Sequence, residues 1–211
     1  MPSADHRTPD AGNCLVLGVT GPVAGGKTSA SDALAARGAE VLELDAIGHA
    51  LLAEPEVRAE VNAGFPEVAG IGDQAELRSR LGEIVFADAG RLADLERILH
   101  ERMCARVRER VDTRRAAADG SVVVVSGALL YEMGLDETCD AVLVVDAPPE
   151  VRRQRAAESR GWSAEEVARR EARQLSAEVK RGRADRVIDN AGNLQSLEAE
   201  VASILEEFSC P

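Results

Sequence analysis

The chain has 211 residues, a formal net charge of −12 at pH 7 and 45% hydrophobic residues, with aromatic residues at only 2%. This length suits one domain with a full core and a small inserted subdomain, and the acidic balance argues against nucleic acid as a partner. No stretch reaches the length of uncharged apolar sequence that a membrane span needs, so we also expect no membrane partner.

Residues 1–13 are polar, contain two prolines and lack the apolar segment of a signal peptide, so we expect a disordered tail before a domain at 14–211. The four cysteines are far apart and form no C-x-x-C pair, which argues against a zinc site or a disulfide framework. We therefore expect a cytoplasmic protein.

The apolar run at 14–20 predicts a buried strand, and it leads directly into Gly-Pro-Val-Ala-Gly-Gly-Lys-Thr at 21–28. A helix-compatible segment follows at 29–37. Strand, glycine loop and helix are the context of a G-x-x-x-x-G-K-[ST] phosphate site, in which backbone N–H groups and the helix N-terminus surround the phosphates. Lys27 would reach the β- and γ-phosphates and the Thr28 hydroxyl would bind Mg²⁺. The pattern predicts a nucleoside triphosphate as ligand.

Four further apolar runs, at 40–44, 121–125, 141–145 and 186–188, also predict buried strands. Continuous apolar runs separated by helical stretches are typical of a parallel sheet covered on both faces. We therefore predict a doubly wound α/β fold with a five-stranded parallel sheet, including a helix between the third and fourth strands.

Residues 46–118 contain no convincing strand and are too many for a plain crossover. Within them, apolar residues recur at spacings of three and four and predict one long amphipathic helix: Leu92, Leu95, Leu99, Met103 and Val107. We interpret 46–118 as an inserted helical subdomain that binds the second substrate.

Residues 151–183 hold ten Arg or Lys against five Glu. Such a basic segment on an acidic chain indicates a local anionic ligand, although a solvated helix surface with i,i+4 ion pairs explains it equally well. Guanidinium groups suit phosphoryl transfer because they fork around phosphate oxygens and stay charged. Arg155 is the preferred candidate, and Arg152 and Arg153 are equivalent alternatives. Trp162 could stack on a base, but a lone Trp is more often a packing residue.

Asp45 follows the second strand at the sheet edge where open α/β folds bind ligands, and its carboxylate could accept a proton from an acceptor hydroxyl. The alternative is a helix cap. Glu43, expected on the same strand face, could hold Mg²⁺ through water. After the last strand, the amide of Asn190 could read an adenine edge, although Asn-Ala-Gly at 190–192 may equally be turn chemistry.

Together these segments resemble the dephospho-coenzyme A kinase family, from about Leu15 to Ile204. Besides the glycine loop and Asp45, the resemblance rests on Leu-Gly-Glu-Ile-Val-Phe at 81–86, Leu-Glu-Arg-Ile-Leu-His at 95–100 and Leu-Leu-Tyr-Glu at 129–132. It also rests on Gln174, Lys180, Ala184-Asp185 and Val187 to Asn190.

The resemblance implies transfer of the ATP γ-phosphoryl group to the 3′-hydroxyl of dephospho-coenzyme A, by a monomer or weak homo-oligomer. Asp45 would be the general base, 46–118 the acceptor-binding region and 151–183 the lid, with Lys27 and Arg155 completing the catalytic set. The implied ATP-binding residues are Gly21, Ala24, Gly25, Gly26, Lys27, Thr28, Ser29, Arg160, Asn190 and Gly192. The implied acceptor-binding residues are Asp45, His100, Leu129 and Leu130.

The sequence departs from the family pattern at several positions. Pro22 replaces a loop glycine, Gly25 replaces a serine, and Glu43 replaces an aspartate two residues before Asp45. Ser-Gly-Ala at 126–128 stands where the family has Asp-Val-Pro. The altered segment at 126–128 leaves open a kinase of another small acceptor such as a nucleoside monophosphate. The loss of several family residues leaves open a nucleotide-binding paralogue with little turnover.

Overall fold

The computed structural model describes residues 14–209. The expected tail at 1–13 and Cys210 therefore lie outside the described residues. The chain divides into two compact units. One unit comprises residues 44–109, and the other comprises the described residues before 44 and after 109.

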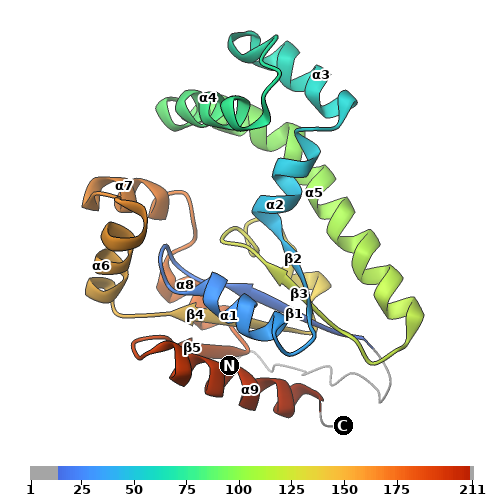
Figure 1. Ribbon diagram of the computed structural model, residues 1–211, viewed down its shortest axis with the longest axis vertical. Coiled ribbons are helices and arrows are strands. Elements are labelled where there is room, and N and C mark those ends of the chain that lie inside the picture. Colours follow the sequence, from blue (N-terminus) through green and yellow to red (C-terminus); the bar gives the residue numbers. More distant parts are fainter. Residues whose placement is uncertain (1–13, 210–211) are drawn as a thin grey trace. The chain divides into compact units, whose positions relative to one another are not determined.

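The larger unit is built on a five-stranded parallel sheet (Figure 1). Its spatial order is β2-β3-β1-β4-β5. The strands are β1 (Leu15–Thr20), β2 (Glu40–Glu43), β3 (Val122–Ser126), β4 (Ala141–Asp146) and β5 (Arg186–Asp189). The strand bounds agree with the predicted ones to within one residue at each end. The predicted α/β fold with a parallel five-stranded sheet is confirmed.

Two helices cover one face of this sheet, α1 (Lys27–Ala35) and α9 (Leu194–Ser209). Their apolar faces form one continuous core with the side chains that the strands direct to that face. In the core, Ala33 and Leu34 of α1 and Leu197, Val201 and Ile204 of α9 meet Leu17, Val19, Leu143 and Ile188.

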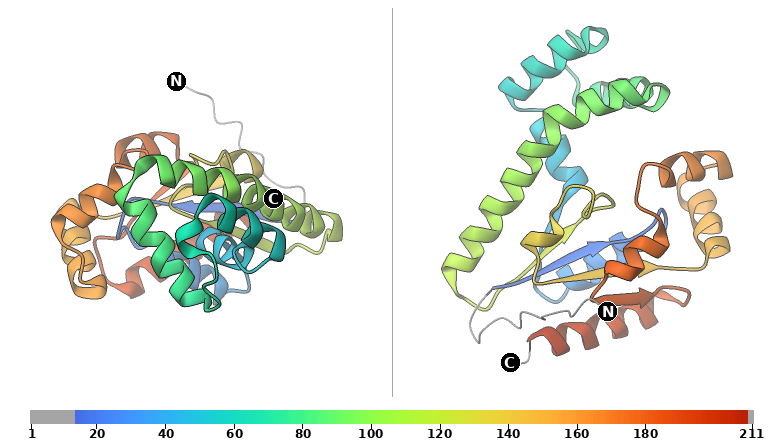
Figure 2. Two further views of the ribbon diagram at one scale, coloured as in Figure 1. Left: turned by 90° about the horizontal axis from the view of Figure 1, so that it is seen from above. Right: turned by 180° about the vertical axis from the view of Figure 1, so that it is seen from behind.

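The opposite face is covered partly by the connection between β3 and β4 and by α8 (Ala177–Arg183), which the view from behind shows in front of the strands (Figure 2). A Cβ added to Gly18 of β1 would lie 3.0 Å from Leu130 and 3.1 Å from the sulfur of Cys139. This tight packing pins the connection to β1, and burial raises the pKa of the Cys139 thiol to about 12.

The helix predicted between the third and fourth strands is absent from residues 127–140, and that expectation was wrong. The chain instead makes tight turns and one 3₁₀ turn at Asp136–Thr138. Gly134, at φ 66°, adopts a left-handed conformation that ends any helical run, and Leu135 N–H returns to the carbonyl of Leu130. The doubly wound sheet tolerates this because the connection itself packs on β1.

The smaller unit is helical. It contains α2 (Leu44–Leu51), α3 (Pro55–Gly64), a 3₁₀ turn at Pro66–Val68, α4 (Gln74–Ala87) and the first two thirds of α5 (Ala89–Ala117). It has its own apolar core, formed by Leu51, Val57, Val61, Phe65, Val68, Leu77, Leu81, Val85 and Val107. The long helix predicted from the spacing of Leu92 to Val107 corresponds to α5.

The basic segment forms α6 (Pro149–Arg160), α7 (Ala164–Glu171) and α8. Ala156 of α6 and Val167 of α7 pack on Val23 of the glycine loop, with Trp162 beside them. Within the predicted lid at 151–183, α8 packs on β4, whereas α6 and α7 pack on each other and on the glycine loop. The lid itself stays a prediction. None of the helices formed by residues 14–209 is long and apolar enough to cross a membrane.

Candidate active site

The glycine loop at 21–26 connects β1 to α1, and two of its glycines lie too close to β4 to carry a side chain. A Cβ at Gly21 or Gly25 would lie 2.1 or 2.5 Å from the carbonyl oxygen of Val145 on β4. Ala24 has φ 58°, a left-handed conformation uncommon outside glycine. The loop therefore lies directly on the end of the sheet.

Pro22 does not disturb this loop. It is buried, and its carbonyl accepts a hydrogen bond of 3.1 Å from the N–H of Gly25, which closes a tight turn. Proline lacks an N–H and has a fixed φ, and both properties are compatible with the first residue of such a turn.

Gly26 is the N-cap of α1, with φ 104°. Asn190, which follows β5, donates a hydrogen bond of 2.9 Å from its side-chain amide to the carbonyl of Gly25. The same amide nitrogen would lie 1.8 Å from a Cβ on Gly26. The predicted adenine contact of Asn190 stays a prediction, but the structure gives this residue a second role, which is to support the loop.

The N-terminus of α1 is arranged to attract an anion. Its N-cap makes no side-chain hydrogen bond, and its first turn contains no acidic residue. The first N–H groups of a helix lack intrahelical partners and carry partial positive charge. Lys27 and Ser29 are half-buried and Thr28 is exposed in this first turn. This arrangement is compatible with the phosphate cradle that the motif predicts, which stays a prediction.

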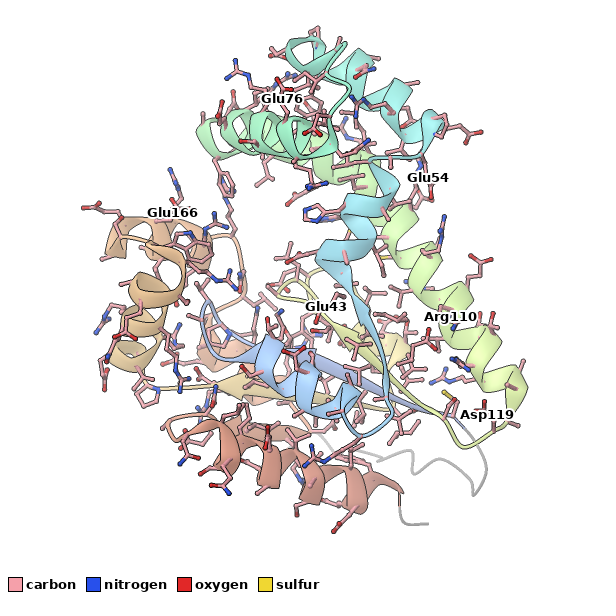
Figure 3. All side chains as sticks on the ribbon, viewed as in Figure 1. Glu43, Glu54, Glu76, Arg110, Asp119 and Glu166 are labelled. Atoms are coloured by element: carbon pink, nitrogen blue, oxygen red, sulfur yellow. The ribbon has the colours of Figure 1, made fainter. Side chains whose placement is uncertain are left out.

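Where β3 ends, the structure explains what stands in place of the family's carboxylate. Ser126 is fully buried, and its hydroxyl oxygen accepts a hydrogen bond of 2.9 Å from the hydroxyl of Ser31 on α1. Glu43 ends β2 in register with Ser126. Figure 3 labels Glu43 at this end of β2. A pair of hydroxyls therefore closes the sheet against α1, and a carboxylate is available one strand away.

Asp45 lies in the smaller unit, in the first turn of α2. β2 ends at Glu43 and the helix begins at the next residue. The expectation that Glu43 and Asp45 share a strand face was therefore wrong, because the backbone turns between them. His49 lies in the last turn of α2, and His100 is half-buried on α5.

The arginines of α6 have different surroundings, which the sequence did not distinguish. Arg152 is buried and lies 3.5 Å from Oδ1 of Asp146, and it donates to the carbonyls of Ala147 and Val23. It also pairs with Glu171 of α7. Arg153 is exposed. Arg152 is thus a structural residue that joins the sheet, the glycine loop and α7.

Arg155 is half-buried and donates to the carbonyls of Asn190 at 2.8 Å and Gly192 at 3.3 Å. These bonds occupy two of the five N–H groups of a guanidinium. Arg160 is exposed and stacks on Trp162 at 4.7 Å, while Arg170 lies 4.0 Å from the same ring. Trp162 thus packs with α6 and α7, which agrees with the interpretation of a lone Trp as a packing residue.

The two leucines predicted to bind the acceptor differ in exposure. Leu129 is half-exposed, whereas Leu130 is fully buried against β1. The position of Leu130 does not support a direct contact with a substrate, and we assign it to the core.

Sequence reasoning missed the roles of two residues here. Asp146, at the end of β4, forms ion pairs with both Arg152 and Arg181. Its place at the end of an apolar strand is the sequence feature that could have indicated this role. Lys180 is fully buried, although it stands among exposed charges on a polar helix and has no neighbour in sequence that indicates burial.

Among residues 14–209, no group of three or more His, Cys, Asp or Glu side chains could hold a metal ion. A glycine loop before an uncapped helix N-terminus suits phosphate in many unrelated proteins, so it does not by itself identify a family. The family model for dephospho-CoA kinase (CoaE) matches residues 15–196. The chain belongs to the dephospho-CoA kinase family.

Curated relatives agree with this assignment. The dephospho-CoA kinase of Deinococcus radiodurans is 41% identical over 194 residues and covers 91% of each chain. That of Thermobifida fusca is 39% identical over 196 residues, which is 92% of this chain and 96% of the relative. The chain therefore has the function of this family and is an ATP-dependent phosphotransferase.

Solved structures show the same fold. TT1252 from Thermus thermophilus superposes with a TM-score of 0.76 at 32% identity, covering 92% of this chain and 98% of that one. Dephospho-CoA kinase from Campylobacter jejuni, at 22% identity and a TM-score of 0.63, shares the fold. Membership of this family favours a kinase that acts on dephospho-CoA. It disfavours both a kinase of another small acceptor and a nucleotide-binding paralogue with little turnover.

Proposed function

We propose that this enzyme transfers the γ-phosphoryl group of ATP to the 3′-hydroxyl of dephospho-CoA, with the phosphates bound at the N-terminus of α1. The observation that carries this proposal is the uncapped helix N-terminus beside Lys27, in a chain of this family. Loop N–H groups and the ammonium of Lys27 oppose the negative charge that spreads over the migrating group.

Asp45 is the proposed general base. It comes two residues after β2, where its carboxylate accepts the proton of the acceptor hydroxyl as that oxygen attacks the γ-phosphorus. Support comes from its position after the strand and from the match to the family's base.

Mg²⁺ is the proposed metal, and the donors present fit it. Thr28 supplies an exposed hydroxyl in the first turn of α1, and Glu43 supplies a carboxylate at the end of β2. Mg²⁺ prefers such oxygen ligands and commonly keeps several waters while it binds phosphates. When bound, it would neutralise phosphate charge; Thr28 would bind it directly and Glu43 through water.

Arg155 and Arg160 are the proposed lid cations. Arg155 already lies on the carbonyls of 190 and 192, which are the residues proposed to surround the adenine. Leu129 and His100 remain proposed acceptor-binding residues. We propose that the enzyme meets both small substrates in the cytoplasm as a monomer or weak homo-oligomer.

An ADP-release assay with Mg-ATP tests the proposal, with dephospho-CoA, AMP, CMP and no acceptor measured in parallel. Turnover with dephospho-CoA alone is expected. Equal or faster turnover with a nucleoside monophosphate would refute the proposed acceptor, and ATP binding without turnover on any acceptor would refute the proposed reaction.

A further inference from the structure

Lys180 of α8 is an unusual residue in this structure because its side chain is fully buried. Lysine is almost never fully buried unless its charge is paired. Burial lowers the pKa of Lys180, the neighbouring charge of Lys27 lowers it further, and Glu132 opposes both effects. A charge kept in such a place needs partners that hold it.

Those partners match the ammonium group in number. The Nζ atom of Lys180 lies 2.5 Å from the carbonyl oxygen of Ala128, 3.1 Å from Oε1 of Gln174 and 3.6 Å from Oε1 of Glu132. An ammonium has three N–H donors and no acceptor, and here two hydrogen bonds and one ion pair engage it. Lys180 is therefore engaged by protein groups of the larger unit.

The three partners come from two segments that are far apart in sequence. Ala128 and Glu132 belong to the connection after β3, which also contains the half-exposed Leu129. Gln174 belongs to the link between α7 and α8. In the same link, the N–H of Leu175 donates a hydrogen bond of 2.6 Å to Oε1 of Glu132. Lys180 thus links the connection after β3, which contains the proposed acceptor-binding Leu129, to the segment between α7 and α8.

The connection after β3 also reaches the phosphate loop. The carbonyl of Ala128, which Lys180 binds, accepts a second hydrogen bond of 3.5 Å from the hydroxyl of Thr20. Thr20 is the last residue of β1 and directly precedes Gly21. A change in the position of Ala128 would therefore affect both the connection that carries Leu129 and the start of the loop.

We propose that Lys180 is a positioning residue for phosphoryl transfer, which fixes residues 127–132 between the phosphate loop and the α7–α8 link so that the acceptor is held for attack. This inference rests on the proposed function. A well-packed apolar side chain could stabilise the fold at this point without the desolvation cost of a charge. What Lys180 adds is a defined geometry at three oxygens.

The test is Lys180→Met, which shortens the unbranched side chain by one atom and removes the charge and its donors. Glu178→Met, at an exposed residue of the same helix, is the matched control. For each protein, kcat, KM for dephospho-CoA, the Kd for ATP and the melting temperature are measured, with kinetics well below the melting temperature. We expect Lys180→Met to lower kcat/KM for dephospho-CoA by about tenfold or more, with the Kd for ATP nearly unchanged and little change in the control.

If Lys180→Met does not fold, Gln174→Met removes one acceptor and leaves the charge in place. It should lower kcat/KM for dephospho-CoA in the same direction by a smaller factor. A folded variant with unchanged kcat/KM for dephospho-CoA would overturn the positioning role. So would a variant whose affinity for ATP falls by the same factor as its kcat/KM. In both cases an active wild-type enzyme would still support the proposed reaction. A wild-type enzyme that binds ATP and does not phosphorylate dephospho-CoA would instead overturn the proposed function, and the inference with it.

Discussion

The amide nitrogen of Asn190 lies 1.8 Å from the point that a Cβ on Gly26 would occupy. A Cβ at residue 26 would therefore displace the Asn190 amide from its hydrogen bond with the carbonyl of Gly25. Because the N-cap sets the direction of the first N–H groups of α1, this contact couples the last strand to the proposed phosphate-binding end of α1.

Gly26→Ala should therefore damage both stability and nucleotide binding. A left-handed conformation at a residue other than glycine costs on the order of 1–3 kcal/mol, and the clash with Asn190 adds to that. Urea unfolding and ATP titration measure the two effects. Gly182→Ala is the control, because no atom lies within 4 Å of its Cβ position and its φ is not in the positive region. Equal stability and ATP affinity in the two variants would contradict the role of Gly26.

The hydroxyl pair of Ser31 and Ser126 should contribute to stability as a unit. Either single change to alanine leaves a buried hydroxyl without this partner, which costs about 1–3 kcal/mol. The double variant should lose less than the sum of the single variants, because no unpaired hydroxyl remains. A double-mutant cycle of the free energy of unfolding measures the coupling, and strict additivity would show that the hydrogen bond adds nothing.

Asp45→Asn should lower kcat by roughly 10²- to 10⁴-fold, because an amide cannot accept the proton of the attacking hydroxyl. The Kd for ATP should stay close to that of the wild type. Steady-state kinetics and ATP titration check both expectations, and Asp112→Asn, an exposed aspartate on α5, serves as the control. An unchanged kcat would exclude Asp45 as the base.

The stability of the larger unit should depend on pH through Glu40. Burial alone would raise the pKa of Glu40, but hydrogen bonds from Arg110 and Arg114, each 2.5 Å long, outweigh it and lower the pKa (Figure 3 labels Arg110). Since the folded-state pKa lies below the unfolded value, the stabilisation is complete above the unfolded pKa and is lost as pH falls through the folded one.

Urea unfolding from about pH 6 to about pH 3 tests this dependence. Glu40→Gln should be less stable than the wild type near neutral pH, and the difference should shrink as the solution becomes acidic. Glu101→Gln, at an exposed glutamate of α5, should show the pH dependence of the wild type. A difference between Glu40→Gln and the wild type that does not change with pH would contradict this account.

The sequence predicted the sheet well because buried parallel strands are apolar throughout, and all five such runs became strands. The connection after β3 was mispredicted because its glycine turns and its packing on Gly18 depend on contacts that sequence periodicity does not encode. The different roles of Arg152 and Arg153 could not be predicted either, because the two residues are adjacent in sequence. Only the fold shows that Arg152 is the one that lies against Asp146. Lys180 is the extreme case, since all three of its oxygen partners come from other segments or turns of the chain.

The most direct test of the central claim is to follow the labelled γ-phosphoryl group of ATP into product with dephospho-CoA as acceptor. The account predicts that the wild type places the label on the 3′-oxygen and yields coenzyme A, and that Lys27→Ala yields none because it no longer holds the phosphates. Label released only as inorganic phosphate, or a Lys27→Ala enzyme as active as the wild type, would contradict it.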